Sequence, residues 1–186
     1  MDTMSSTHRR RPAIQGDAAG IHAIYAPVVR DSATSFEYEV PSVEEMARRM
    51  RVGMDRYPWV VAVDPEDDSA VWGYAYACSW RARAAYQWSC EVSVYVHPEH
   101  HRKGIATALY RDLLARLKEA GYLLIVAGVT LPNDPSVAFH EDFGFEPVGV
   151  FPGCGFKFGR WYDVGFWKLD LGERVADPQD PTPFGA

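Results

Sequence analysis

The 186-residue sequence lacks the features that mark several classes of protein. No run approaches the roughly 20 apolar residues of a membrane-spanning helix. Cys78, Cys90 and Cys154 are odd in number and include no C-x-x-C pair, which favours neither a disulfide framework nor a zinc site. A net charge of −6 offers no basic surplus for nucleic acid. We therefore expect small-molecule partners, no membrane or nucleic acid, and a reducing cytoplasm.

Both ends of the chain differ in composition from its middle. Residues 1–10 are basic but are followed by no apolar run, so they predict a flexible tail rather than a secretory signal. Residues 172–186 combine three prolines with acidic and small residues, which predicts a second flexible tail. One folded domain over 11–171 remains, and its length is sufficient to bury a core.

Hydrophobic periodicity and turn residues predict alternating strands and helices. Ser42 and Glu45 have the spacing of a capping box, and 123–129 is apolar enough for a strand covered on both faces. The predicted strands are 11–15, 59–63, 71–78, 86–96, 123–129, 146–151 and 161–171, and the predicted helices are 17–28, 42–50, 104–120 and 135–143. This order indicates an α+β (mixed α/β) domain with a central mixed, mostly antiparallel sheet flanked by helices.

A basic turn joins the strand 86–96 to the helix 104–120. Gly104 lets the backbone approach an anion, and the first N–H groups of the helix are unpaired and carry partial positive charge. Arg102 and Lys103 add two cations, so the segment is a candidate pyrophosphate clamp. The alternative is a plain turn with a solvated basic pair. The spacing of a nucleotide P-loop is absent.

The turn resembles the acetyl-CoA loop of the GNAT superfamily of N-acetyltransferases, [RQ]-x-x-G-x-[GA]. Gly104 and Ala106 match this pattern, and His101 departs from it at the first position. Segment 133–145 resembles the second motif of the superfamily, N-x-x-[AS]-x-x-[FL]-[YH]-x-x-x-G-F. A likeness to the phosphinothricin and methionine sulfoximine acetyltransferases extends over nearly the whole folded region, including 91–96 and 155–167.

The resemblance implies direct acetyl transfer from acetyl-CoA to the amine of a small amino-acid-like substrate, without a metal or a covalent enzyme intermediate. Glutamate analogues such as phosphinothricin or methionine sulfoximine are the implied acceptors, and detoxification or resistance is the implied role. The implied acetyl-CoA contacts are Val94, Tyr95, Val96, His101, Arg102, Lys103, Gly104, Ile105, Ala106, Asn133 and Ser136. Asn133 and Ser136 are also common helix-capping residues, so capping is their alternative role.

Glu91 lies on the strand that leads into the basic turn, and the resemblance implies that it is the general base. An unperturbed Glu has a pKa of ~4.3, so burial or a water relay is needed for this role. A structural ion pair with Arg81 or Arg83 is the alternative. Cys90 is adjacent, but strand alternation points it to the opposite face, which argues against a cysteine nucleophile.

His140 occupies the position at which many relatives carry a tyrosine that protonates the coenzyme thiolate. A catalytic or cofactor-orienting role is implied, and a structural histidine is the alternative. His97, His100 and His101 lie at a strand end before the basic turn. We expect no companion carboxylate or cysteine cluster beside them, and therefore no metal.

The acceptor site is predicted from residues outside the two motifs: Phe36, Arg81, Arg83, Tyr86 and Lys157. A guanidinium binds a carboxylate or phosphinate through two hydrogen bonds, which suits Arg83. Arg81 and Lys157 are equally compatible with solvated surface cations.

The aromatic residues Trp161, Tyr162, Phe166 and Trp167 indicate core or a subunit interface, and the resemblance implies a homodimer. Two other functions stay open. One is acetylation of another amino acid, a polyamine or a protein amine. The other is a non-catalytic CoA-binding regulatory module, suggested by His101.

Overall fold

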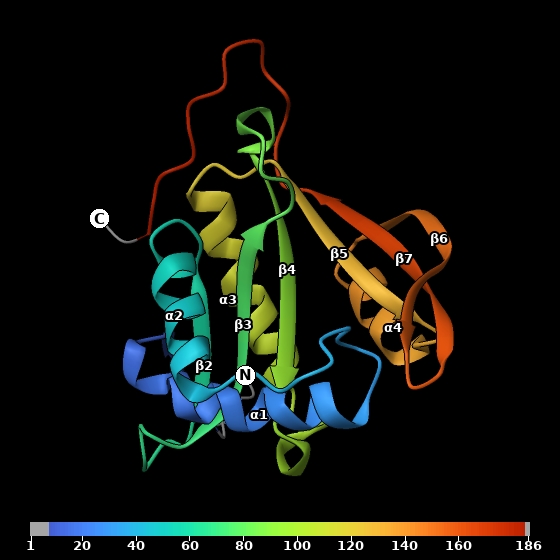
Figure 1. Cartoon of the computed structure of the whole chain (residues 1–186). Coiled ribbons are helices and arrows are strands. Elements are labelled where there is room, and N and C mark those ends of the chain that lie inside the picture. The colour runs from blue at the N-terminus through green and yellow to red at the C-terminus, as the bar shows by residue number, and fades with distance from the viewer. Residues whose placement is uncertain (1–7, 185–186) are drawn as a thin grey trace, which may run out of the picture.

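The computed structural model describes residues 8–184. Within this range, seven strands form one sheet in the order β1-β2-β3-β4-β5-β7-β6. Figure 1 shows helices α1 and α2 in front of the sheet and α3 and α4 behind it. Neighbouring strands are antiparallel except β4 and β5, which are parallel. The predicted fold class, a mixed and mostly antiparallel sheet flanked by helices, is confirmed.

The strands are β1 (Arg9–Pro12), β2 (Trp59–Val63), β3 (Val71–Ser79), β4 (Ser89–Val96), β5 (Leu124–Leu131), β6 (Glu146–Lys157) and β7 (Arg160–Asp170). The helices are α1 (Ala18–Asp31), α2 (Val43–Met54), α3 (Ile105–Glu119) and α4 (Asp134–Asp142), with 3-10 turns η1 (Gln15–Asp17), η2 (Ala84–Tyr86) and η3 (Pro98–His100).

Three strand boundaries differ from the sequence-based expectation by three residues or more. β1 ends at Pro12 rather than at residue 15, and Gln15–Asp17 form the 3-10 turn η1 instead. β4 begins at Ser89 because Ala84–Tyr86 form a 3-10 turn rather than strand. β6 continues past Phe151 to Lys157 because it pairs with β7 as one long hairpin, with an irregularity between Phe151 and Gly155. The sequence pattern predicted that these strands exist, but the tertiary pairing sets where they end.

The two sheet faces are covered by amphipathic helices. On one face, Ile21 of α1 and Met50 of α2 pack on β2 and β3. On the other, Leu109 and Leu113 of α3 are fully buried against the central strands. Ser42 caps α2 by accepting the Glu45 N–H at 3.1 Å, as predicted. Because both faces are covered, the sequences of the inner strands are mostly apolar.

The sheet opens at its centre, between β4 and β5. These strands pair only where Ser89–Glu91 face Leu124–Val126, although β4 continues to Val96 and β5 to Leu131. Figure 1 shows them diverging beyond that point. The β4 backbone groups that face β5 therefore have no ladder partners beyond Glu91, and a notch forms in the middle of the sheet.

Both predicted tails differ from the expectation within the described residues. β1 begins at Arg9, inside the segment 1–10, whose first seven residues lie outside the described range. The C-terminal segment docks on the domain: the Trp88 indole N–H donates to the Gln179 carbonyl at 2.8 Å, and the Thr182 N–H donates to the Ala120 carbonyl at 2.8 Å. Phe184 also packs against the core on the α3 side. Local composition did not show these long-range contacts.

Candidate active site

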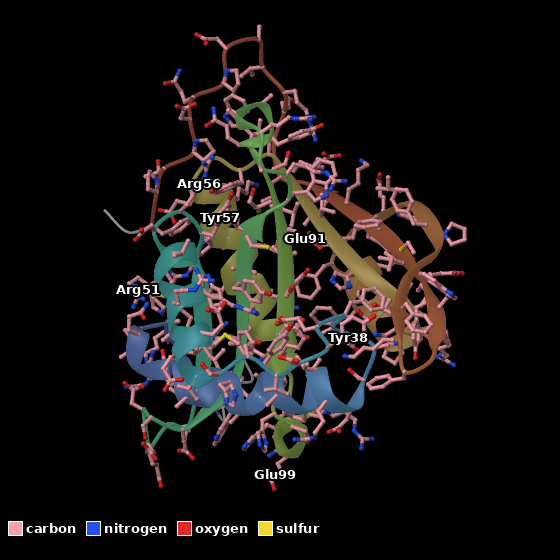
Figure 2. The ribbon with its side chains drawn as sticks, viewed as in Figure 1. Tyr38, Arg51, Arg56, Tyr57, Glu91 and Glu99 are labelled. Carbon is pink, nitrogen blue, oxygen red and sulfur yellow. The ribbon has the colours of Figure 1, made fainter. Side chains whose placement is uncertain are left out.

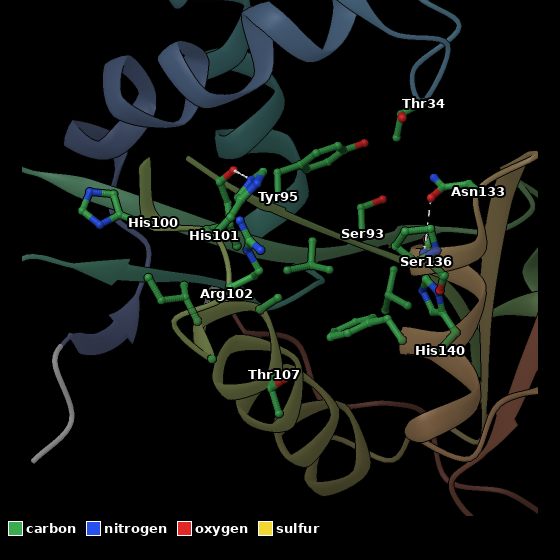
Figure 3. A pocket seen from close by; sticks show the side chains of 18 of the residues that line it. Thr34, Ser93, Tyr95, His100, His101, Arg102, Thr107, Asn133, Ser136 and His140 are labelled. Carbon is green, nitrogen blue, oxygen red and sulfur yellow. Dashed lines mark hydrogen bonds between the residues drawn. The ribbon is translucent and has the colours of Figure 1, made fainter. Parts of the chain in front are cut away.

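A cleft of about 530 Å³ opens from the notch between β4 and β5, and Figure 3 shows the side chains around it. Its walls are the unpaired edge of β4, the first turn of α3 and the first two turns of α4. The structure brings together here the predicted cofactor contacts Val94, Tyr95, Val96, His101, Arg102, Gly104, Ile105, Ala106, Asn133 and Ser136. Lys103 is not among the lining residues, because its Nζ lies 3.3 Å from the Nδ1 of His100.

The turn before α3 leaves the helix N-terminus open. Gly104 has φ of +75°, a conformation that glycine adopts without strain, and it forms no side-chain cap. The first N–H groups of the 15-residue helix α3 are therefore available to an anion, beside the Arg102 guanidinium. His101, which departs from the motif, closes the turn by donating from Nε2 to the Val96 carbonyl at 2.9 Å.

Asn133 and Ser136 both cap α4 and border the cleft. The Asn133 Oδ1 accepts the Ser136 backbone N–H at 3.3 Å, so the capping role considered from the sequence is present. Both residues also line the cleft, as Figure 3 shows. The two roles are compatible because capping uses the backbone N–H of Ser136 and leaves its hydroxyl free of that bond.

His140 lies on the cleft wall with a fixed orientation. The residue is 7% exposed, and its Nδ1 lies 2.7 Å from the Ser136 carbonyl oxygen. Because a carbonyl only accepts, Nδ1 carries the proton, and in the neutral ring Nε2 is an acceptor. Burial lowers the pKa of His140, and the bond to Ser136 opposes this only in part. A neutral imidazole is therefore the favoured form at neutral pH.

Glu91 lies in the middle of the sheet, where β4 and β5 diverge (Figure 2). Cys90 is fully buried in the core on the α3 side, so the predicted alternation is confirmed and the thiol faces away from Glu91. Burial raises the pKa of Glu91, and the charge of Arg81 opposes this shift. Arg81 acts through its charge, not through the ion pair that the sequence left open as an alternative.

Glu91 faces a second cavity of about 470 Å³, which it shares with two predicted acceptor-site residues, Phe36 and Arg81. Thr34 and Gly128 line both this cavity and the cleft, so the two spaces meet beside Glu91. We call this space the acceptor cavity. Two ligands that enter from opposite sides would thus meet at one carboxylate.

Gly128 is a site residue that the sequence reasoning missed. A Cβ at this position would lie 3.1 Å from the Oε1 of Glu91, which is tight enough to displace the carboxylate. Glycine in the interior of a buried strand is a signal of close approach by another group, and it could have identified this position. The absence of a side chain keeps the passage between the cleft and the acceptor cavity open.

Arg83 and Tyr86 are not brought to this cavity. Both are exposed on the segment that joins β3 to β4, where Tyr86 packs edge to face on Trp80 at 5.4 Å.

The aromatic residues near the C-terminus differ in exposure: Tyr162 and Trp167 are buried, whereas Trp161 is 67% exposed.

Lys157 differs from both of its sequence-based interpretations. It is 2% exposed, and Nζ donates to the carbonyls of Val29 (2.6 Å), Ser32 (2.8 Å) and Ser35 (2.7 Å). It is therefore neither a substrate contact nor a solvated cation. Burial lowers its pKa, while the carbonyls at the C-terminal end of α1 stabilise the ammonium. The long strand β6 carries Lys157 to this position, which the shorter predicted strand did not reach.

The expectation that no carboxylate accompanies the three histidines is wrong, because Glu99 lies beside two of them. In the part of the chain that the structure describes, His97, Glu99 and His100 place possible ligand atoms within 4.8 Å of one another. Glu99 is exposed, and the Nδ1 of His100 already accepts a hydrogen bond from the Nζ of Lys103. This grouping alone does not define a metal centre.

Comparison with known proteins identifies the class. The protein-family model of the acetyltransferase (GNAT) domain matches residues 11–165 of the sequence. The chain therefore belongs to the GNAT acetyltransferase family, and it is an N-acetyltransferase. None of the helices within residues 8–184 has the length and apolar character needed to cross a bilayer.

Three relatives narrow the comparison. The chain is 39% identical over 173 residues to phosphinothricin N-acetyltransferase of Streptomyces viridochromogenes, covering 93% of this chain and 92% of that one. It is 33% identical to L-methionine sulfoximine/L-methionine sulfone acetyltransferase of Salmonella typhimurium, covering 89% and 96%. A phosphinothricin acetyltransferase from Sinorhizobium meliloti, solved in complex with AcCoA, superposes with a TM-score of 0.86 and 38% identity, covering 95% and 94%.

The substitution Lys157→Met tests the structural role of this lysine. It leaves three buried carbonyls without their charged donor, so we expect the free energy of unfolding to fall by about 2–4 kcal/mol in urea titrations. Lys118→Met, on the exposed side of α3, is the control and should change stability by less than about 0.5 kcal/mol. An equally stable Lys157→Met protein would contradict this role.

Proposed function

We propose that the protein transfers the acetyl group of acetyl-CoA to the α-amine of a small amino acid analogue of the phosphinothricin or methionine sulfoximine type. The observation that carries this proposal is the position of Glu91, a carboxylate held where the cleft meets the acceptor cavity. The relatives named for these two acceptors, at 39% and 33% identity, support the substrate class.

The cleft fits the chemical parts of acetyl-CoA. The open N-terminus of α3 and Arg102 suit the pyrophosphate, and the unpaired edge of β4 suits the amide groups of an extended arm. Acetyl-CoA supplies the thioester: the amine nitrogen forms the amide bond to the acetyl carbon as the C–S bond breaks. Of the two protons that the ammonium nitrogen loses, one goes to the general base and the other to the leaving thiolate. No metal ligand is needed for this chemistry.

Glu91 is proposed as the general base. Its raised pKa makes the carboxylate a stronger proton acceptor than an exposed Glu, and the acceptor cavity brings the amine beside it. Arg81 lines the same cavity and provides a cation for the carboxylate of an amino acid. The side chain of Phe36 forms an apolar wall, which keeps water from competing with the amine.

His140 is proposed to orient the cofactor rather than to donate a proton. In the neutral ring, Nδ1–H is committed to the Ser136 carbonyl, and Nε2 can only accept a hydrogen bond. A proton-donating His140 would have to be the imidazolium, which burial disfavours. The sequence left both roles open, and the geometry favours orientation of the cofactor.

On this proposal the reaction blocks the amine of a toxic glutamate analogue, which supports a role in detoxification or resistance. The cytoplasm is the proposed location. The thiols of Cys78, Cys90 and Cys154 are all free, as expected in a reducing compartment.

Thiol release from acetyl-CoA tests the reaction and the base together. We expect turnover with phosphinothricin and methionine sulfoximine, little with glutamate or spermidine, and a loss of about 10²–10⁴-fold in kcat/KM in Glu91→Gln. Glu119→Gln, at the end of α3, is the control and should retain wild-type rates. Turnover with none of the amines would refute the substrate class. Full activity of Glu91→Gln would refute the role of this residue.

The pH dependence of kcat/KM separates the roles of Glu91 and His140. The wild-type rate should rise as pH passes the raised pKa of Glu91, above its ordinary 4.5, because the carboxylate must lose its proton to act as a base. Because the pKa of His140 lies below its ordinary 6.5, no fall in rate is expected between that pH and 8. A descending limb in this range that disappears in His140→Gln would show that the imidazolium is required.

A homodimer is part of the proposal, and it is supported by the apolar surface of the β6–β7 hairpin. The large exposed side chains there are Val148, Val150, Phe151, Phe156, Phe158 and Trp161. Clustered exposed apolar side chains mark interaction surfaces. Light scattering after gel filtration should give twice the chain mass of 20.9 kDa. Trp161→Glu should shift this to one chain, whereas Val175→Glu, exposed near the C-terminus, should not; a wild-type monomer would refute the dimer.

A further inference from the structure

A small cavity of about 180 Å³ adjoins the acceptor cavity at Thr34 and Thr130, which line both spaces. Thr34 is labelled in Figure 3. Among the described residues that line the small cavity, Arg160, the first residue of β7, is the one cation, and none carries a carboxylate. We call this space the side pocket. It has room for a small group rather than for a whole ligand, so it extends the acceptor cavity instead of forming a separate site.

Strand alternation places the acceptor cavity and the side pocket on one face of the sheet. Gly128 and Thr130 of β5 line the acceptor cavity, whereas Val129 between them lies in the core on the α3 side. On β7, Val164 lines the acceptor cavity and Arg160 lines the side pocket, and their separation of four residues puts them on the same face. Since a strand advances about 3.3 Å per residue, Gly128 and Thr130 are about 7 Å apart, which a side chain with two methylene groups and a terminal oxygen can span. An acceptor whose amine lies at Glu91 can therefore extend along this face towards Arg160.

An aromatic ring holds the Arg160 guanidinium, and no acidic residue neutralises it. Its Cζ lies 4.3 Å from the centre of the Tyr162 ring, which packs in turn on Phe36 of the acceptor cavity with ring centres 6.2 Å apart. None of the ion pairs within residues 8–184 includes Arg160. A guanidinium stacked on a ring keeps the N–H groups at its edge available to an anion. Arg160 is thus an oriented cation without an anionic partner.

The loop between α1 and α2 holds the end of the hairpin that carries Arg160. The hydroxyl of Tyr38, labelled in Figure 2, donates to the Phe156 carbonyl at 2.8 Å. Lys157, which pairs with Arg160 across the hairpin, donates to carbonyls of the same loop. Thr34 belongs to this loop, so these contacts keep Arg160 and Thr34 on facing sides of the side pocket.

The acceptor cavity and the side pocket together contain two cations, Arg81 and Arg160, and one carboxylate, Glu91. An acceptor with one ammonium group and two anionic groups is complementary to this set. Its ammonium can lie at Glu91, its α-carboxylate at Arg81 and its second anion at Arg160. An acceptor with a neutral side chain leaves Arg160 hydrated, which costs little because this residue is exposed.

We propose that Arg160 binds the anionic group at the end of the acceptor side chain, so that the enzyme favours phosphinothricin over methionine sulfoximine while accepting both. The inference rests on the proposed function and makes Arg160 a specificity-determining residue of that reaction. Arg81 keeps the α-carboxylate, and the side pocket reads the charge of the side chain.

Phosphinothricin and methionine sulfoximine form a matched pair, because both side chains end in a tetrahedral group with one methyl and only the phosphinate is anionic. We would measure kcat/KM for both in wild type and Arg160→Gln. The value for phosphinothricin should fall about five- to tenfold, mainly through KM, since the guanidinium is exposed and its bond to an anion is partly screened. The value for methionine sulfoximine and the KM for acetyl-CoA should not change. Arg160→Lys keeps the charge without the planar fork and should restore part of the loss.

Arg51→Gln is the charge-matched control. Arg51 is exposed on α2, is labelled in Figure 2 and lines neither cavity, so its loss should leave the ratio of the two kcat/KM values unchanged. For the case that Arg160→Gln does not fold, wild type provides a second measurement. Added salt should raise the KM for phosphinothricin more than that for methionine sulfoximine, because the two acceptors share the α-carboxylate and differ in the second anion.

An unchanged ratio in folded Arg160→Gln, or an equal loss for both acceptors, overturns the role of Arg160 and leaves the proposed function standing. With wild type alone, an equal response of both KM values to salt does the same. A wild-type enzyme that acetylates neither phosphinothricin nor methionine sulfoximine overturns the proposed function itself.

Discussion

The backbone of β4 needs hydrogen-bond partners on both sides, but beyond Glu91 the chain supplies them on one side only. β3 pairs with β4 along its full length to Val96, whereas β5 pairs with it only as far as Glu91. A buried strand with unpaired N–H and C=O groups is unfavourable unless something replaces the missing neighbour. An extended ligand with amide groups, as in the proposed function, can replace it in the manner of an added strand. The cleft, its polarity and its length along β4 all follow from this interrupted pairing.

The divergence also decides where chemistry can occur. Glu91 is the last β4 residue that pairs with β5, so its side chain lies at the vertex of the notch. It is too buried to be fully solvated, yet it borders open space because Gly128 on β5 has no side chain. His140, across the cleft, is also shifted towards its neutral form by burial. In the proposed reaction, this pairing of a buried carboxylate with an uncharged ring would suit proton removal from an ammonium more than proton donation.

Sequence reasoning captured what depends on local pattern and motif. The helix positions follow from periodicity, and the turn before α3 follows from Gly104 and from two spaced signatures. It did not place Lys157 or the C-terminal segment, because their roles depend on partners far away in the chain: Lys157 bonds Val29, 128 residues earlier. The sequence does not distinguish a surface lysine from a buried one. Whether Lys157 is buried depends on how far β6 extends, and the predicted strand was too short. Sequence reasoning also missed Gly128, because this residue contributes by lacking a side chain rather than by carrying a chemical group.

The acceptor side of the site depends on the loop between α1 and α2. Thr34 borders both the cleft and the acceptor cavity, so the loop must hold a defined position for the two spaces to meet at Glu91. Lys157 fixes one side of the loop through the Ser32 and Ser35 carbonyls. The Tyr25 hydroxyl fixes the other by donating to Glu37 at 2.7 Å. Since these contacts already hold the loop, binding of the proposed acceptor would need little further ordering of the loop, and binding free energy would remain available to position the amine.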